Sequence, residues 1–123
     1  MAKQVCAVMG VAFLVVAVWG FIDGEHVLIF HVNTAHNIVH LLSGILALAC
    51  AYAGEKAARS FCLIFGSVYG LVAILGFLNV AWANELLHLN DADDVLHLVI
   101  VVIFLIADSV SPRTVVAARS ASA

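Results

Sequence analysis

Four apolar stretches fill most of the chain, and their length limits what it can fold into. They cover about residues 5–22, 35–53, 60–80 and 92–107. An α-helix needs about 20 apolar residues to cross a hydrocarbon core about 30 Å thick. Only 11% of the residues are charged and 65% are hydrophobic, whereas a soluble domain is about one quarter charged. We therefore expect an all-α integral membrane protein, folded as a single domain over residues 1–123 and crossing the bilayer four times.

The first apolar stretch follows Lys3, as the hydrophobic region of a signal peptide follows a basic one. No small-x-small cleavage site follows it in a polar context. We therefore expect this stretch to be retained as a span.

The basic residues predict the orientation of the spans. All five lie before the first stretch, between the second and third, or after the fourth: Lys3, Lys56, Arg59, Arg113 and Arg119. The other two loops carry acidic residues instead: Asp23, Glu25, Glu85, Asp91, Asp93 and Asp94. Because basic loops stay in the cytoplasm, we expect a multi-pass protein of the cell's inner (plasma) membrane with both termini cytoplasmic. So few basic residues, all on that side, give no support to nucleic-acid binding.

The three cysteines, Cys6, Cys50 and Cys62, all map near the cytoplasmic ends of the spans. That compartment is reducing in most cells. We therefore expect no disulfide, and interpret the cysteines as small apolar residues.

A polar segment occurs twice in this apolar chain. Residues 31–41 read HVNTAHNIVHL and residues 88–98 read HLNDADDVLHL, with five of eleven positions identical. Gly20-Phe21 and Gly76-Phe77 precede the two copies at nearly the same distance. The unit is therefore a hairpin of two spans, with repeats over about residues 5–53 and 60–107 and a cytoplasmic tail over 108–123. Such parallel repeats are related by a pseudo-two-fold axis along the membrane normal, which makes the expected fold a four-helix bundle of two tandem hairpins.

The start of each polar segment suits a helix N-terminus. Asn33, Thr34, Asn90 and Asp91 carry side chains that cap the unpaired N–H groups of a first helical turn. We therefore expect these four residues to be helix caps.

Capping does not explain His40 and His97, which lie about two turns further on, roughly 9 Å along the axis. Residues four apart share a helix face, so His36 accompanies His40, and Asp93 accompanies His97. If the repeats bring these pairs together, the four residues suit a divalent transition metal such as zinc, iron or copper. Asn37 and Asp94 are candidates to orient the ligands.

Two alternatives use the same histidines without that metal. His40 and His97 could join the repeats through hydrogen bonds to Asn, Asp or backbone groups, with no cofactor. They could also be the two axial ligands of a b-type haem, whereas c-type attachment lacks its C-x-x-C-H motif. The remaining histidines, His26, His31 and His88, fall in the outer loops, where we expect solvated polar residues rather than secondary ligands or a capture surface.

The duplicated motif resembles that of an uncharacterised family of small bacterial four-span membrane proteins, classed as a domain of unknown function. Its pattern is Asn-x-x-His-Asn-x-x-His-Leu at the second span, with a degenerate copy at the fourth. Matching residues are Asn33, His36, Asn37, His40 and Leu41 in the first copy, and Asn90, Asp94, His97 and Leu98 in the second. The resemblance covers roughly residues 10–107 and implies the fold and topology, but no activity. Thr34 departs from it, since many relatives have proline there.

No catalytic set emerges from these residues, so we do not expect an enzyme. The preferred hypothesis is a small membrane protein that binds a transition metal for sensing, buffering or transfer. The alternatives are an accessory subunit of a larger membrane complex, or a haem-based electron-transfer protein. Besides the lipid bilayer, the expected partners are further copies of the chain or that larger complex.

Overall fold

The computed structural model describes residues 1–113. The rest of the expected tail, residues 114–123 with Arg119, lies outside the described residues. Four long helices are present: α1 (Ala2–Asp23), α2 (Thr34–Ala53), α3 (Glu55–Phe77) and α5 (Asp91–Val110). A two-stranded antiparallel ribbon of β1 (His26–Val27) and β2 (Phe30–His31) joins α1 to α2, and a short helix, α4 (Ala81–Leu87), lies between α3 and α5.

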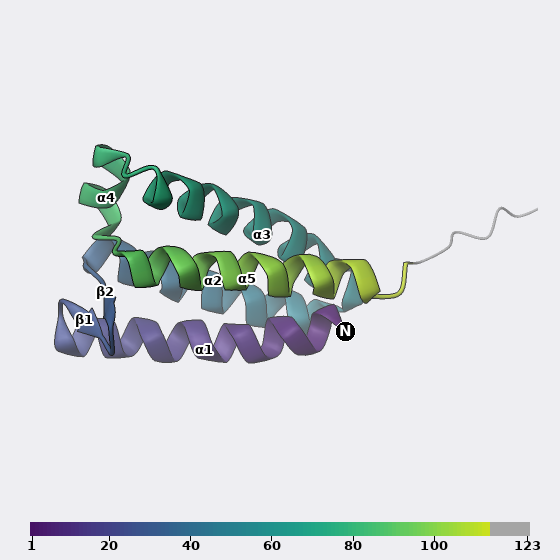
Figure 1. Ribbon diagram of the computed structural model, residues 1–123. Coiled ribbons are helices and arrows are strands. Elements are labelled where there is room, and N and C mark those ends of the chain that lie inside the picture. The colour runs from purple at the N-terminus through teal and green to yellow at the C-terminus, as the bar shows by residue number, and fades with distance from the viewer. Residues whose placement is uncertain (114–123) are drawn as a thin grey trace, which may run out of the picture.

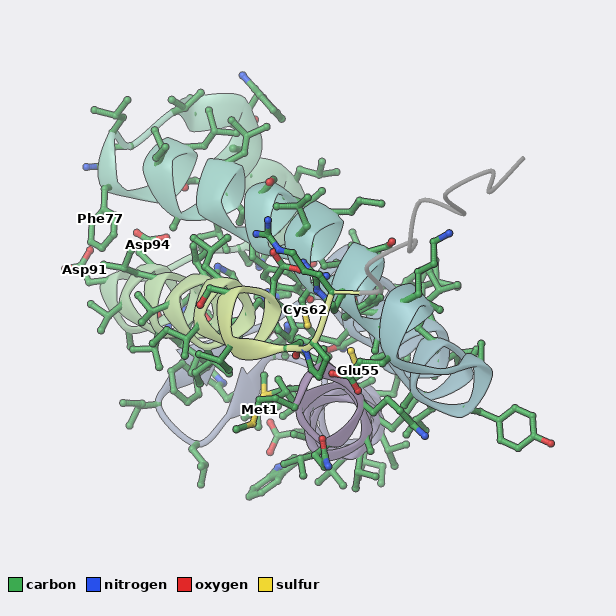
Figure 2. All side chains as sticks on the ribbon, turned by 90° about the vertical axis from the view of Figure 1, so that its right-hand side faces the viewer. Met1, Glu55, Cys62, Phe77, Asp91 and Asp94 are labelled. Atoms are coloured by element: carbon green, nitrogen blue, oxygen red, sulfur yellow. The ribbon has the colours of Figure 1, made fainter. Side chains whose placement is uncertain are left out.

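The long helices pack most closely in pairs, α1 along α2 and α3 along α5. Figure 1 shows β1, β2 and α4 together at one end of the molecule, which we call the loop end. The start of α1 and the end of α5 lie at the opposite end, which we call the terminal end (Figure 1). Figure 2 views the terminal end, where the Met1 amino group lies 2.9 Å from the Glu55 carboxylate.

Three helices of the described chain, α1, α2 and α3, are long and apolar enough to cross a membrane. The fourth long helix, α5, has 20 residues and an apolar run over residues 95–107 that is interrupted by His97. It also carries Asp91, Asp93 and Asp94 in its first turn, and Asp108 near its end. The composition therefore agrees with a membrane protein, and the aspartates set α5 apart from the other three helices.

The two halves of the chain bury equivalent positions. Between α1 and α3, buried residues recur 56 positions apart: Ala2/Ala58, Cys6/Cys62, Gly10/Gly66, Phe13/Tyr69, Ala17/Ala73 and Gly20/Gly76. Between α2 and α5 they recur 57 positions apart: His36/Asp93, Asn37/Asp94, His40/His97, Ser43/Ile100 and Ala47/Phe104. The internal repeat seen in the sequence is therefore also a repeat of the packing.

The helix ends differ in places from the expected spans. Helix α3 begins at Glu55 and ends at Phe77, rather than covering 60–80, because the chain turns at Asn79, whose φ is 51°. Helix α5 continues to Val110, three residues into the expected tail. The ribbon and α4 were not predicted, since elements this short leave little periodic signal.

All three cysteines are free, and two of them touch. The sulfur atoms of Cys6 and Cys62 lie 3.7 Å apart in the buried contact between α1 and α3. Both side chains are fully buried, in agreement with their interpretation as apolar core residues.

Candidate metal centre

The polar segments begin with two equivalent helix caps. The Asn33 side-chain oxygen accepts the backbone N–H of His36 at 2.8 Å, and that of Asn90 accepts the backbone N–H of Asp93 at 2.9 Å. These contacts are the N-cap geometry expected of asparagine. Thr34 and Asp91, which were also expected to cap, are instead the first residues of α2 and α5.

The same two asparagines tie each half of the chain to the loop of the other. The Asn33 amide donates to the carbonyl of Leu86 at 2.8 Å, and the Asn90 amide donates to the carbonyl of Ile29 at 3.0 Å. Ile29 and Leu86 are themselves 57 positions apart. The starts of α2 and α5 are therefore fixed at one depth by a reciprocal pair of hydrogen bonds.

Just below these caps, three histidine side chains converge between α2 and α5. His36, His40 and His97 each offer a ring nitrogen, and the three nitrogens lie within 4.8 Å of one another. The ring centroids of His36 and His40 are 4.5 Å apart, and those of His36 and His97 are 5.7 Å apart. All three residues are at most 5% exposed. We call them the three-histidine cluster.

Each ring of the cluster has a buried nitrogen with no hydrogen-bond partner among the described residues. These nitrogens are His36 Nε2, His40 Nδ1 and His97 Nδ1. An unpaired buried polar atom is costly, about 1–3 kcal/mol. The other nitrogen of His36 is engaged, since its Nδ1 lies 2.9 Å from the Leu87 carbonyl and donates to it in the matching tautomer. That contact leaves the Nε2 lone pair free, which is how a metal-binding histidine is usually oriented.

A small, mostly apolar cavity adjoins the cluster. It measures about 20 Å³ and is lined by all three histidines together with Val39, Val68, Tyr69, Val72 and Leu87. About 10–15 Å³ suffices for one water molecule, so the space suits a small ligand and not a macrocycle. Phe13 stacks on His40 with ring centroids 5.7 Å apart, and Tyr69 lies 5.3 Å from His97. These aromatic rings hold the imidazoles in place from the core side.

Asp93, the fourth predicted ligand, is buried but used differently. Its carboxylate accepts the backbone N–H of Asn90 at 3.0 Å and that of His31 at 3.2 Å. The first contact completes a capping box at the start of α5, and the second holds the β ribbon. The structure thus brings three of the four predicted ligands together, while the Asp93 carboxylate binds backbone groups.

Asn37 and Asp94, the predicted orienting residues, make no hydrogen bond to the cluster. Asn37 packs against Gly20 of α1, and Asp94 packs against Gly76 of α3, so that a Cβ at either glycine would collide with the polar side chain. In Figure 2, Asp94 lies beside the end of α3 near Phe77. The Asn37 Oδ1 and Asp94 Oδ1 atoms are buried without a partner. The sequence signal for these contacts was the repeated Gly-Phe pair, whose packing role was missed.

The other histidines are exposed at the loop end. His26 and His31 are paired across the β ribbon, with ring centroids 4.8 Å apart. His88 ends α4 in the left-handed conformation, with φ 50°. None of the three belongs to the three-histidine cluster.

The hydrogen-bond network proposed for His40 and His97 is not seen among the described residues. Neither side chain bonds an asparagine, an aspartate or a backbone group, and both keep an unpartnered Nδ1. A site of three imidazole nitrogens with one open position is a common way to hold zinc. The chemistry of the donor set therefore fits a transition-metal ion.

Comparison with known proteins identifies a family without adding a function. No curated protein and no solved structure matches the chain. One family model, described as a domain of unknown function, matches residues 3–110. That range holds both polar segments and all of the four long helices except Ala2, the first residue of α1. The chain belongs to the family called Domain of unknown function (DUF4383).

Proposed function

We propose that this protein binds one divalent transition-metal ion between two membrane-spanning helices, through His36, His40 and His97. The single observation that carries the proposal is the convergence of three buried imidazoles, each with an unpartnered ring nitrogen. A metal ion would satisfy all three nitrogens at once, whereas no group in the described part of the chain does so. The role that follows is sensing, buffering or transfer of the ion.

The spacing of the nitrogens is compatible with such an ion. Zinc–nitrogen bonds measure about 2.0–2.1 Å, so two ligand nitrogens of a tetrahedral site lie about 3.4 Å apart. The three nitrogens here lie within 4.8 Å of one another, and modest rotation of the imidazoles closes that difference. Iron, copper and nickel also accept imidazole. The cavity of about 20 Å³ beside the cluster has room for one water molecule, which would serve as a fourth ligand. The same volume favours an ion over a haem.

The topology proposed with this site is a bundle of four spans, α1, α2, α3 and α5, built from two tandem hairpins. Their pseudo-two-fold axis runs along the membrane normal. Support comes from the equivalent buried positions and the reciprocal asparagine contacts. Four basic residues of the described chain lie toward the terminal end, Lys3, Lys56, Arg59 and Arg113. We therefore assign that end to the cytoplasmic face of the plasma membrane, and the cluster to the outer half.

The test is to purify the full chain in mild detergent without a histidine tag and to measure bound metal by elemental analysis. We expect about one transition-metal ion per chain. His36→Ala, His40→Ala and His97→Ala should each lose it, because two remaining imidazoles hold an ion far less tightly. His88→Asn is the matched control, since His88 is exposed and asparagine tolerates its left-handed backbone.

A colourless, metal-free protein that stays folded and takes up no added Zn²⁺ would contradict the proposal. The histidines would then be packing residues, and an accessory subunit of a larger complex would be the better hypothesis.

Asp93→Asn distinguishes a site of three histidines from a four-ligand site that also includes the Asp93 carboxylate. We expect the metal to remain, because an amide oxygen can still accept the backbone N–H groups that Asp93 binds now.

A further inference from the structure

We propose that His26 and His31 form a second metal site, exposed at the loop end, which captures a divalent transition-metal ion before the ion enters the three-histidine cluster. The capture role rests on the proposed function, whereas chelation by the two exposed histidines does not. The site differs from the cluster in residues, in burial and in the part of the fold that holds it.

The β ribbon places the two imidazoles on one face. His26 and His31 are direct partners in the antiparallel register, and their rings meet edge to face at 84°, with centroids 4.8 Å apart. Successive residues of a strand point to opposite faces. The neighbouring pair, Val27 and Phe30, therefore turns the other way, and Val27 is only 2% exposed. The apolar face packs inward, and both histidines are left exposed to solvent.

Several hydrogen bonds hold the ribbon in this arrangement. The His31 N–H donates to the Asp93 carboxylate at 3.2 Å, and the Ile29 carbonyl accepts from the Asn90 amide at 3.0 Å. The Val32 N–H donates to the Glu25 carbonyl at 2.9 Å. These bonds use backbone atoms of the ribbon, so both imidazoles stay available. A pair of ligands fixed in advance binds more tightly, since little freedom is lost on binding.

The chemistry around the pair suits a cation. Imidazole is a good ligand for zinc, copper and nickel. The loop end also carries the exposed carboxylates of Asp23, Glu25, Glu85 and Asp91, and such a field raises the local concentration of cations. Two ligands leave the other coordination positions to water, so the ion is held less tightly than by three buried imidazoles. Weaker binding at the surface than inside is what a capture site requires.

The second repeat supplies an internal comparison. His88 is the equivalent of His31, 57 positions later, but the equivalent of His26 is Ala83. The chain therefore has one exposed histidine pair at the ribbon and an unmatched histidine at α4. His88→Asn removes an exposed imidazole without touching the pair.

The experiment is a Cu²⁺ titration of the full, tag-free chain in detergent after a chelator has removed any bound metal, followed by electron paramagnetic resonance to count the nitrogens on each ion. We expect two Cu²⁺ per chain, one with three nitrogens and one with two. His26→Ala and His31→Ala should each lose the two-nitrogen signal and one bound ion, and His88→Asn should lose neither. His40→Ala should lose only the three-nitrogen signal. Unchanged stoichiometry and spectra in both His26→Ala and His31→Ala would overturn the second site.

The capture role has its own readout, the rate at which the cluster fills under limiting Cu²⁺. In His26→Ala we expect the three-nitrogen signal to reach the same final intensity several-fold more slowly. An unchanged rate would overturn capture even if the pair binds Cu²⁺. If wild type shows only the two-nitrogen signal, the proposed function and capture both fail, while the exposed chelating site stands.

Discussion

At the scale of single residues, the polar groups inside this apolar chain divide by what they contact. Asn33, Asn90 and Asp93 bind backbone N–H groups near the helix starts. Asn37 and Asp94 pack against the backbone of a neighbouring helix at a glycine. Among residues 1–113, only the three histidines keep unpartnered atoms that face one another. Buried polar groups are normally hydrogen-bonded, and the unpartnered ring nitrogens of the cluster are therefore the observation that supports the proposed metal site.

The glycine contacts give a prediction at this scale. Gly20→Ala or Gly76→Ala should destabilise the fold by about 1–3 kcal/mol, the usual cost of overpacking, because a Cβ there overlaps Asn37 or Asp94. Gly70→Ala is the matched control on α3, since its Cβ would meet Val101 at an ordinary 3.6 Å. The measurement is reversible unfolding in detergent. Equal stability of Gly20→Ala and Gly70→Ala would show that Asn37 does not occupy this contact.

At the scale of elements, local chemistry is what the sequence predicts well. The cap positions of Asn33 and Asn90 follow from a preference expressed within one helical turn, and the pairing of His36 with His40 follows from the helix period. The convergence of His97 on that pair was predicted because the repeat relates the two helices. The hydrogen bond from the His31 N–H to the Asp93 carboxylate was not predicted. It depends on the β ribbon, whose turn places Leu28 at φ 56°. Such a turn leaves no local signature, because leucine rarely adopts positive φ.

The contact between α1 and α3 gives a prediction for a pair of elements. The Cys6 and Cys62 sulfurs lie 3.7 Å apart, so a small rotation of both side chains brings them to the 2.05 Å of a disulfide. Treatment of the folded protein with a small membrane-permeant disulfide oxidant should therefore link the two within one chain. Peptide mapping under non-reducing conditions detects the link, and Cys6→Ser abolishes it. A dominant link between Cys50 and either residue would contradict this packing of α1 on α3.

At the scale of the whole molecule, the charges and the repeat agree on one arrangement. The acidic loops, the ribbon and α4 share the loop end, while the basic residues of the described chain lie toward the terminal end (Figure 1). Two equivalent halves that each cross the membrane twice must point the same way. The topology proposed above puts the cluster near one face, within about two helical turns of the caps, and would give an ion access from outside without crossing the apolar half of the bundle.

The proposed topology requires α5 to cross the membrane, which labelling from either side can test. If α5 spans the bilayer despite its aspartates, each of the three connections between the long helices lies on a defined side of the membrane. In a background with Cys6, Cys50 and Cys62 replaced by serine, a cysteine at Glu85 should react with a membrane-impermeant thiol reagent on intact cells. A cysteine at Lys56 should react only after the membrane is opened, and both side chains are exposed, so access to the thiol is comparable. Labelling of Lys56→Cys from outside would reverse the orientation. Labelling of Arg113→Cys from outside, with Lys56→Cys protected, would mean that α5 does not cross, and the three-histidine cluster would then lie between a span and a surface helix.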